Sequence, residues 1–578
     1  MKNNLKKIWT ILDLNQKKQF YTLIFLILLG MFFELLSIGL VFPVVSILFD
    51  VGNESSVYMQ KIFSLLNSEI SREKMVVFSL ISLILVYLIK NLVLTLIAKI
   101  EVSKVIKIKF QIAEKLYKKF INFPYKFHSN TNSSILINYV IDQIDSFSNS
   151  LFNCVILTAE ILILVGVILT LFIIEPSGTL IIAIFSTIFA YLFYSVMKKR
   201  ISKLSEERSF NNSLKIKNLQ ETFGSIKEIK IYNKENYFLN LFNFFNRKVV
   251  NIEGYETFLK RLPRLWFEFL CVLIFVTFLI FIFLFSKIDL ISLTPILGIF
   301  GVATIRIIPS VNRILLAIQT INFGEAAIKM ISENLNKRDS KDNYTKIMDL
   351  EKFNFSKNLN FENVDFKFNN NTQIFNKINF NIQKGDFVGV FGETGVGKST
   401  LLNLLLGLIK PSGGEIKVDN YDIHKNLRGW QFKIGFVPQN IYLLDDSISK
   451  NIAFGFDGNK IDKERLENTI KEAQLEKFVQ SLPDKENTFV GERGMQVSGG
   501  QLQRIGIARA IYSNPEVLIF DESTSSLDNE TELKIMETIK SIKKDKTIIF
   551  VSHKKTPMKF CNKIFELKKN KIFENTNL

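Results

Sequence analysis

The chain has 578 residues, of which 48% are hydrophobic, and it carries a formal net charge of +18. This length exceeds that of one compact domain and suits two or three. The apolar content, with 54 Phe and a positive mean hydropathy, is higher than soluble proteins of this size usually show and predicts membrane segments. The positive charge fits nucleic-acid binding, contact with anionic lipid, or the cytoplasmic loops of a membrane protein. Because apolar segments are present, the third interpretation is favoured.

Six apolar runs in the N-terminal part of the chain are each long enough to cross a bilayer as a helix, which takes about 20 residues. Their approximate limits are residues 21–48, 75–97, 151–174, 180–197, 265–285 and 291–318. Lys and Arg are concentrated before the first run and in the long connectors 99–126 and 198–264, whereas the connector 175–179 has no cation. This asymmetry predicts that the N-terminus and the long connectors are cytoplasmic.

The long connectors are expected to be helical as well. Residues 106–123 and 214–245 carry apolar side chains at helical spacing with charges between them, which predicts membrane helices that continue into the cytoplasm and turn back. A shorter helical stripe at residues 57–66 indicates either an amphipathic helix on the outer membrane surface or a loop packed on the helices.

The composition becomes polar near Glu333, and we interpret residues 331–355 as a linker. After it, short strand-like apolar runs such as residues 387–391 and 517–520 alternate with helical ones, a pattern typical of a mainly parallel α/β domain. We therefore predict an all-α transmembrane domain of six helices over residues 1–330, followed by an α/β domain over residues 356–578.

Residues 392–399 have the sequence GETGVGKS, between a predicted strand and a predicted helix. This is the P-loop pattern in its required context, because glycines bring backbone N–H groups against phosphates and the helix N-terminus adds its positive dipole. We expect Lys398 to reach the β- and γ-phosphates and Ser399 to hold Mg²⁺. The second domain is thus predicted to be a P-loop nucleotide-binding domain for ATP, with binding candidates Gly392, Thr394, Gly395, Gly397, Lys398, Ser399 and Thr400.

An apolar run at residues 517–520 is followed by two carboxylates, Asp521 and Glu522. We expect Asp521 to position Mg²⁺ and Glu522 to polarise the attacking water as general base. Such a pair after a strand can also cap a loop, but the P-loop upstream favours the catalytic interpretation.

Residues 497–501 have the sequence VSGGQ, which resembles the signature of ATP-binding-cassette (ABC) proteins, where the first residue is more often Leu. Other segments match the family in order: Gln439 matches the Q-loop, residues 525–528 the D-loop and His553 the switch histidine. Phe368 matches the aromatic residue, usually Tyr, that stacks on adenine.

The resemblance extends upstream, because residues 123–145 and 219–235 look like the intracellular loops of ABC exporters. It therefore covers essentially the whole chain and implies an exporter-type half-transporter that hydrolyses ATP. It also implies that Glu522, His553 and Gln439 take part in catalysis, that Ser399, Gln439 and Asp521 hold Mg²⁺, and that further nucleotide contacts come from Phe368, Ser498, Gly499, Gly500, Gln501 and Asp528.

The family's mechanism requires two cassettes, since the signature of one subunit closes over nucleotide held by the P-loop of the other. This chain carries one cassette, with Lys398 in its P-loop and Ser498 and Gly500 in its signature. The expected partner is a second copy of the chain, in a homodimer with twofold symmetry.

Charged residues inside apolar spans are costly, so each of them is a functional candidate. Arg306 and Arg313 lie seven residues apart in the sixth run, which is about two helical turns, so both point the same way. Arg264 lies at the mouth of the fifth run. These arginines suit a phosphate or pyrophosphate group, while internal pairing with Glu268 or Glu34 is the alternative.

Residues 304–313 look like the sixth helix of PglK-type flippases, which move polyprenyl-pyrophosphate-linked oligosaccharides in bacteria. The resemblance implies ATP-driven flipping of an anionic lipid-linked saccharide across the bacterial inner membrane, with both termini cytoplasmic. Membrane lipid is an expected partner and nucleic acid is not. The alternatives are an exporter of another lipid, a peptide or a drug, and an ATP-gated channel. Glu522, His553 and Ser498 favour a pump over a channel.

Overall fold

The computed structural model describes residues 1–40, 72–174, 176–285, 290–337, 353–367, 372–491, 494, 496–524, 528–542 and 546–575. The chain divides into a helical unit that comprises Met1–Phe123 and His128–Asp339, and an α/β unit that comprises Ser340–Leu578 together with the short segment Pro124–Phe127. The last helix of the helical unit ends at Asn336, so helix continues past residue 330, where we had expected the transmembrane domain to end.

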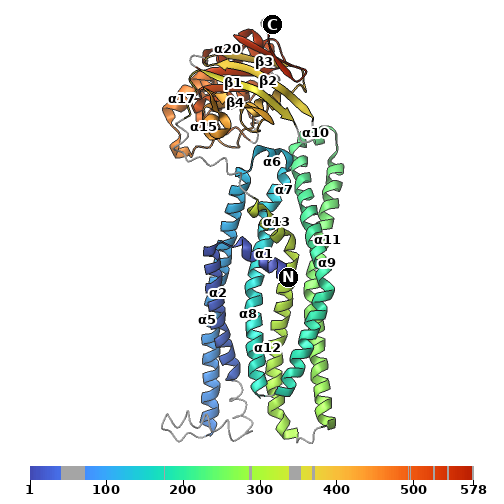
Figure 1. Ribbon diagram of the computed structural model, residues 1–578. Coiled ribbons are helices and arrows are strands. Elements are labelled where there is room, and N and C mark those ends of the chain that lie inside the picture. Colours follow the sequence, from blue (N-terminus) through green and yellow to red (C-terminus); the bar gives the residue numbers. More distant parts are fainter. Residues whose placement is uncertain are drawn as a thin grey trace. The chain divides into compact units, whose positions relative to one another are not determined.

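Long helices run alongside one another in the helical unit (Figure 1), with α2 beside α5, α8 beside α12, and α9 beside α11. A short π-helical segment, Tyr139–Gln143, leads into α8. The α-helices before the α/β unit are α1 (Lys2–Ile11), α2 (Leu14–Gly39), α5 (Arg72–Asn122), α6 (Tyr125–Asn130), α7 (Ser133–Asn138), α8 (Ile144–Ile174), α9 (Pro176–Gly224), α10 (Ile226–Ile231), α11 (Glu235–Phe285), α12 (Leu290–Phe323) and α13 (Glu325–Asn336).

Each of the six predicted apolar runs falls wholly or in part on one of these long helices: α2, α5, α8, α9, α11 and α12. The helices α5 and α9 continue to Asn122 and Gly224, well beyond the apolar runs, which confirms the predicted helical extensions. Among the described residues, three helices are long and apolar enough to cross a membrane, or four if the bent pair α12–α13 counts as one. The number six therefore stays a prediction, and the stripe at residues 57–66 lies outside the described residues.

The packing of the helical unit follows from apolar side chains at helical spacing. On α12, Ile307, Val311 and Leu315 repeat every four residues and so share one face. This face packs against Ile163 and Val167 of α8, and all five side chains are buried. We call this cluster, which also includes Phe267 of α11, the α8–α12 core.

The α/β unit contains two sheets. The antiparallel sheet has the order β2-β1-β4-β5, and the larger sheet has the order β10-β9-β3-β8-β7-β6. In the larger sheet β6, β7, β8, β3 and β9 are parallel neighbours, while β10 pairs antiparallel with β9. The strands are β1 (Asn358–Lys367), β2 (Gln373–Gln383), β3 (Phe387–Gly392), β4 (Gly413–Val418), β5 (Tyr421–Asp422), β6 (Ile434–Val437), β7 (Val517–Asp521), β8 (Thr547–Ser552), β9 (Lys563–Lys568) and β10 (Lys571–Glu574).

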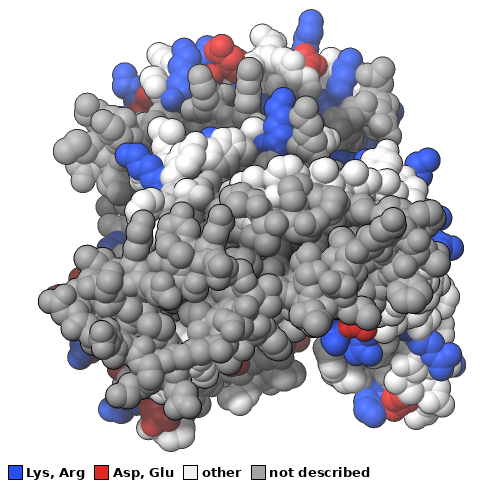
Figure 2. Space-filling model, turned by 90° about the horizontal axis from the view of Figure 1, so that it is seen from below, with Lys and Arg blue, Asp and Glu red and all other residues white. Residues whose placement is uncertain are grey.

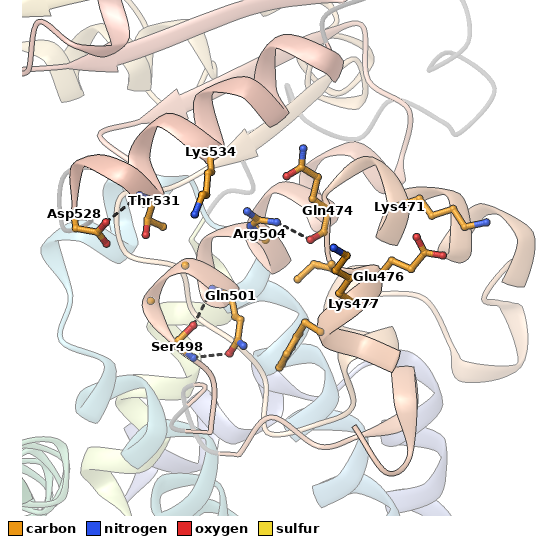
Figure 3. Close-up of a pocket in the computed structure, with 14 residues that line it drawn as sticks. Lys471, Gln474, Glu476, Lys477, Ser498, Gln501, Arg504, Asp528, Thr531 and Lys534 are labelled. Atoms are coloured by element: carbon orange, nitrogen blue, oxygen red, sulfur yellow. Dashed lines mark hydrogen bonds between the residues drawn. The ribbon is translucent and has the colours of Figure 1, made fainter. Parts of the chain in front are cut away.

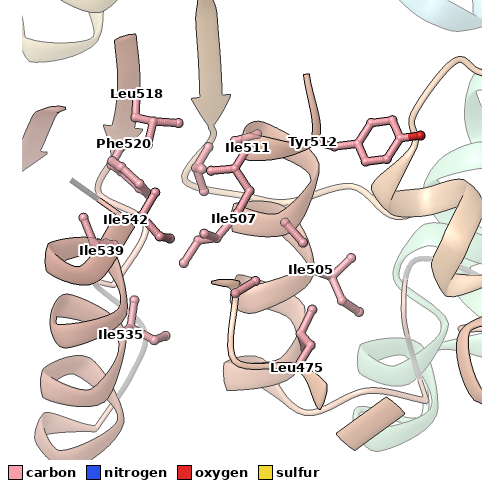
Figure 4. Packing of buried hydrophobic residues seen from close by; sticks show 14 of the residues in the cluster. Leu475, Ile505, Ile507, Ile511, Tyr512, Leu518, Phe520, Ile535, Ile539 and Ile542 are labelled. Carbon is pink, nitrogen blue, oxygen red and sulfur yellow. The ribbon is translucent and has the colours of Figure 1, made fainter. Parts of the chain in front are cut away.

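Continuous apolar sequence explains the central strands, since strands covered on both faces have no polar side to present. β7 reads VLIFD and β8 reads TIIFVS, and nearly all of their side chains are buried. One face of β7 packs on α19 and α20, where isoleucines at helical spacing meet Leu518 and Phe520 (Figure 4). The helices of this unit are α14 (Lys398–Leu405), α15 (Leu427–Phe432), α16 (Ile448–Ile452), α17 (Lys463–Glu472), α18 (Glu476–Gln480), α19 (Gly499–Tyr512) and α20 (Asn529–Ile542).

The surface carries the positive charge expected from the composition. Figure 2 shows the molecule from below, and Lys and Arg are more prominent than Asp and Glu among the described side chains at the rim of this view.

Trp430 ties α15 to the C-terminal end of α14. Its side chain is fully buried, and its indole Nε1–H donates to the backbone oxygen of Leu405 at 2.7 Å. This oxygen is one of the last carbonyls of α14, which have no partner within the helix. The contact therefore supports the helix that begins with Lys398.

We predict that Trp430→Ala lowers the stability of the α/β unit by about 3–5 kcal/mol, the usual loss for a buried aromatic side chain. Thermal unfolding of the full-length protein in detergent would show a lower midpoint for this unit. The control Trp430→Phe keeps a ring and loses the hydrogen bond, so its loss should be smaller, about 1–3 kcal/mol. An unchanged midpoint in Trp430→Ala would contradict the assigned packing role.

Candidate functional site

The loop between β3 and α14 has the backbone that a P-loop requires. Gly395 and Gly397 have φ values of +85° and +108°, which side chains with a Cβ rarely adopt. A Cβ on Gly397 would also lie 2.8 Å from Cγ2 of Ile374. The loop ends at α14, whose first residue is Lys398, so free backbone N–H groups of the helix start face the loop. The backbone of this loop is therefore compatible with the predicted phosphate cradle.

Lys398 is buried in this loop and held by three oxygen atoms. Its Nζ donates to the backbone oxygen of Gly392 at 2.8 Å and to that of Glu393 at 3.2 Å. The same Nζ lies 3.1 Å from Oε1 of Glu522. The P-loop lysine and the proposed general base thus form an ion pair.

Glu522 is the point where the predicted catalytic residues meet. Its Oε2 accepts a hydrogen bond from Nε2 of Gln439 at 3.2 Å and lies 3.3 Å from Nδ1 of His553. Gln439, Glu522 and His553 follow β6, β7 and β8, and Lys398 follows β3. Because these strands are parallel neighbours, their carboxyl ends lie at one edge of the sheet, where α/β folds bind ligands.

The backbone of Glu522 turns the side chain out of the strand. Its N–H still donates to the oxygen of Val551 at 2.9 Å, but its φ is +40°, which is uncommon for a residue other than glycine. Strained backbone of this kind is found at functional sites, where the surrounding structure holds it in place.

Asp521, the last residue of β7, has its pKa raised to about 6. Burial is the main cause, the charge of Glu522 raises the pKa further, and Lys398 acts in the opposite direction. The donor set of Asp521, the Ser399 hydroxyl and the Gln439 amide consists of oxygen ligands, which Mg²⁺ prefers. Among the described residues there is no group of three or more His, Cys, Asp and Glu that could hold a metal ion.

The signature residues form a separate site at the start of α19. Ser498 caps this helix: its Oγ accepts from the backbone N–H of Gln501 at 3.3 Å, and Oε1 of Gln501 accepts from the N–H of Ser498 at 2.8 Å. They border a pocket of about 1050 Å³ (Figure 3). Its lining comprises Lys471, Gln474, Leu475, Glu476, Lys477, Phe478, Ser498, Gly499, Gly500, Gln501, Arg504, Asp528, Thr531 and Lys534.

This pocket unites the predicted signature and D-loop residues but not the P-loop residues. Asp528 borders it and accepts from the N–H of Thr531 at 3.0 Å. Lys398 and Glu522 are not among the described residues that line it. The residues predicted to bind nucleotide therefore lie at two separate places in the described part of the chain.

Several lining residues were not predicted from the sequence. Arg504 points across the pocket and donates to the backbone oxygen of Gln474 at 2.6 Å, and Lys477 and Lys534 add positive charge (Figure 3). They belong to helices around the motif rather than to the motif itself. Arg504 lies on α19, Lys477 on α18 and Lys534 on α20. Neither α18 nor α20 has a net positive charge, so the sequence carried no signal for the two lysines.

The remaining residues predicted for the nucleotide site differ in their exposure. Thr394 and Ser399 are exposed, and Thr400 is half-buried in the first turn of α14. Phe368 lies outside the described residues, so its predicted contact with adenine stays a prediction.

The charged residues of the helical unit form pairs. Nε of Arg313 lies 2.5 Å from Oε1 of Glu160, and its Nη2 donates to Oε2 at 3.3 Å. Arg264 pairs with Glu268 one turn away on α11, at 2.9 Å. The sequence had offered Glu268 and Glu34 as partners for the arginines, and it had not assigned Glu160 to a cation. The side chain of Arg306 lies outside the described residues.

A further pair joins α2 to α5, since Nζ of Lys90 lies 3.9 Å from Oε1 of Glu34. Both side chains are buried, as is Glu160. Removing one partner of a buried pair costs about 3–5 kcal/mol, because the remaining charge lacks both water and a counter-ion. Breaking the Glu34–Lys90 or the Glu160–Arg313 pair is therefore expected to be costly.

Two family models match the chain. The model described as ABC transporter matches residues 375–525, and the model described as ABC transporter transmembrane region matches residues 24–294. Together they cover both units and most of the chain. ATP binding follows from the first match, and a multi-pass membrane domain follows from the second together with the apolar helices.

The relatives of the chain include exporters. An ATP-dependent lipid A-core flippase of Burkholderia pseudomallei is 27% identical over 474 residues, which is 81% of this chain and 78% of the relative. A putative export ATP-binding/permease protein of Rickettsia typhi is 27% identical over 81% of this chain and 80% of the relative. A multidrug resistance ABC transporter ATP-binding and permease protein of Lactococcus lactis is 36% identical, but over only 37% of each chain.

A bacterial Atm1-family ABC exporter with ATP bound has the same fold, with a TM-score of 0.78 over 96% of this chain and 94% of that chain, at 19% identity. The predicted fold class, a helical transmembrane domain followed by an α/β nucleotide-binding domain, is confirmed. The chain belongs to the ABC transporters, as an exporter-type protein whose ATPase activity is coupled to transport.

Proposed function

We propose that the protein uses ATP to flip a lipid-linked saccharide pyrophosphate across the bacterial inner membrane. The observation that carries this proposal is the guanidinium of Arg313, which lies beside the α8–α12 core and keeps 41% of its side chain exposed. A cation held among apolar helices suits an anionic headgroup on a lipid, and an Arg fork matches phosphate oxygens. Arg306, on the same face of α12, and Arg264 are the further candidates for the headgroup.

The comparisons support a lipid substrate more than a drug. The lipid A-core flippase matches along 81% of this chain, whereas the multidrug transporter matches along 37%. An exporter of another lipid, a peptide or a drug is the second candidate. An uncharged drug would not need arginines on the α12 face, whereas another phosphate-bearing lipid would suit them equally.

In the proposed ATPase reaction, Lys398 neutralises phosphate charge within the loop of Gly392–Gly397, and Glu522 orients the attacking water and accepts its proton. His553 contacts the γ-phosphate. Ser399, Gln439 and Asp521 would hold Mg²⁺, which supplies positive charge at the β- and γ-phosphates. The contact between Lys398 and Glu522 at 3.1 Å supports these roles, because it places the proposed base next to the lysine that is proposed to bind phosphate.

The working form is proposed to be a homodimer. The pocket beside Ser498 and the P-loop are separate half-sites within one chain, so a second copy supplies the missing half of each nucleotide site. Ser498, Gly499, Gly500, Gln501 and Asp528 of one copy would then close over nucleotide on the P-loop of the other.

Both termini and the nucleotide-binding domain are proposed to be cytoplasmic, because Lys and Arg are concentrated in the connectors on that side.

We predict that Glu522→Gln retains ATP binding but loses about 100-fold or more of the turnover, because the amide cannot take the proton of water. ATPase assays and nucleotide binding on the same preparation would test this. The matched control is Glu516→Gln, whose carboxylate pairs with Lys433 at 2.8 Å away from the motifs and should leave turnover near the wild-type value. Turnover near normal in Glu522→Gln would exclude it as the base.

We predict that a membrane-impermeant thiol reagent added to intact cells labels Ser177→Cys but not Ser481→Cys, in a background without native cysteines. Residue 177 begins α9 at the predicted outer connector, and residue 481 is exposed in the α/β unit. Both positions should react after the cells are opened. If residue 481 alone were labelled in intact cells, the proposed orientation of the protein in the membrane would be wrong.

We predict that Arg306→Gln together with Arg313→Gln abolishes flipping of a pyrophosphate-linked polyprenyl lipid in proteoliposomes, while basal ATPase activity stays largely intact. The reason is that the headgroup loses its cations and the cassette is unchanged. Arg247→Gln, which removes an exposed charge elsewhere, serves as the control and should flip normally. If a well-folded double variant flips the lipid at the wild-type rate, the arginines do not bind the headgroup.

A further inference from the structure

Glu160 and Arg313 are buried to different extents. The carboxylate is 9% exposed and the guanidinium side chain is 41% exposed. One side of the pair is therefore closed by α8 and the apolar residues next to it, and the other side is open in the single chain. A phosphate group approaching this pair would reach the arginine and not the glutamate.

The contact uses one edge of the guanidinium. Glu160 accepts a hydrogen bond from Nη2, and its Oε1 lies 2.5 Å from Nε as an ion-pair contact, while an arginine has five N–H groups in a fixed planar fork. The N–H groups of Nη1 are not taken up by this contact. The pair can therefore stay intact while the opposite edge of the fork binds a second oxyanion.

Energetics favour an intact pair over an exchange of anions. If a headgroup displaced Glu160, the buried carboxylate would lose the cation that it contacts in the described part of the chain. Leaving a buried charge without its partner costs more than is gained from swapping one anion for another at the same arginine. Glu160 is thus better suited to hold the arginine than to compete with the substrate.

A second observation points to a ligand at the same face of α12. The Oγ of Ser310 is buried, with the residue 1% exposed, and it has no hydrogen-bond partner among the described residues. Ser310 precedes Arg313 by three residues, so both lie on one side of the helix. Buried polar atoms are normally satisfied, so this hydroxyl fits a polar ligand.

We propose that Glu160 is a positioning residue for the transported lipid: it holds Arg313 by the Nε–Nη2 edge and turns the other edge, next to the Ser310 hydroxyl, towards a phosphate oxygen of the headgroup. This rests on the proposed function. Glu160 itself does not touch the substrate. Its carboxylate also balances the charge of Arg313, so that the site binds a phosphate-bearing lipid without trapping it.

The test uses the full-length protein in proteoliposomes, with a polyprenyl pyrophosphate as probe and the uncharged polyprenol as reference. We expect Glu160→Ala to raise the apparent KM for lipid-stimulated ATPase activity about tenfold or more, with kcat and basal activity near wild type. Glu160→Gln keeps one oxygen for the arginine and should recover part of the affinity. Ser310→Ala should weaken the response to the pyrophosphate by a smaller factor and leave the reference unchanged.

The matched control is Glu34→Gln, because Glu34 is a buried carboxylate of similar exposure that pairs with Lys90. It should lower thermal stability without changing the KM for the probe. A lower KM in Glu160→Gln would mean that Glu160 competes with the headgroup, and an unchanged KM in Glu160→Gln and Glu160→Ala would mean a structural role only; either result overturns the proposal. If the wild-type protein responds equally to the pyrophosphate and the polyprenol, the proposed function itself fails.

Discussion

Parallel pairing of β6, β7, β8 and β3 is the constraint on which the nucleotide site depends. Strands that run in one direction end at one edge, so side chains that are far apart in the sequence meet there. Lys398 and His553 are far apart in the sequence, but β3 and β8 are hydrogen-bonded neighbours, and Glu522 after β7 contacts both side chains. Without this order of strands, no single carboxylate could contact the P-loop lysine, the Q-loop glutamine and the switch histidine together.

The residues predicted for this edge could be found because their signals are local. The glycines of the P-loop, the apolar strand before Asp521 and the Ser-Gly-Gly-Gln segment each specify a turn, a strand end or a helix start within a few residues. Apolar runs likewise predicted the long helices. The domain boundary was less certain, because α13 continues as regular helix to Asn336 and nothing in its sequence marks residue 330.

Contacts between distant helices could not be predicted in the same way. Glu160 and Arg313 are 153 residues apart, and their pairing depends on how α8 and α12 align along their length. The sequence analysis identified Arg313 as a charge in an apolar span, but periodicity gives the face of a helix and not the partner across it. The same limit applies to Arg504, whose acceptor is a backbone oxygen of Gln474 and so has no side-chain signal at all.

The cap at the start of α19 has a consequence for the signature serine. A hydroxyl group has one hydrogen to donate and two lone pairs to accept. The cap uses a lone pair of Ser498, because Oγ accepts from the N–H of Gln501, and it leaves the hydrogen available. Asp or Asn at this position would keep the helix start but would place an acceptor oxygen in the same spot. Serine thus caps the helix with a lone pair and can still donate its hydrogen to an anion. The same side chain therefore both fixes where the helix begins and favours a negatively charged ligand.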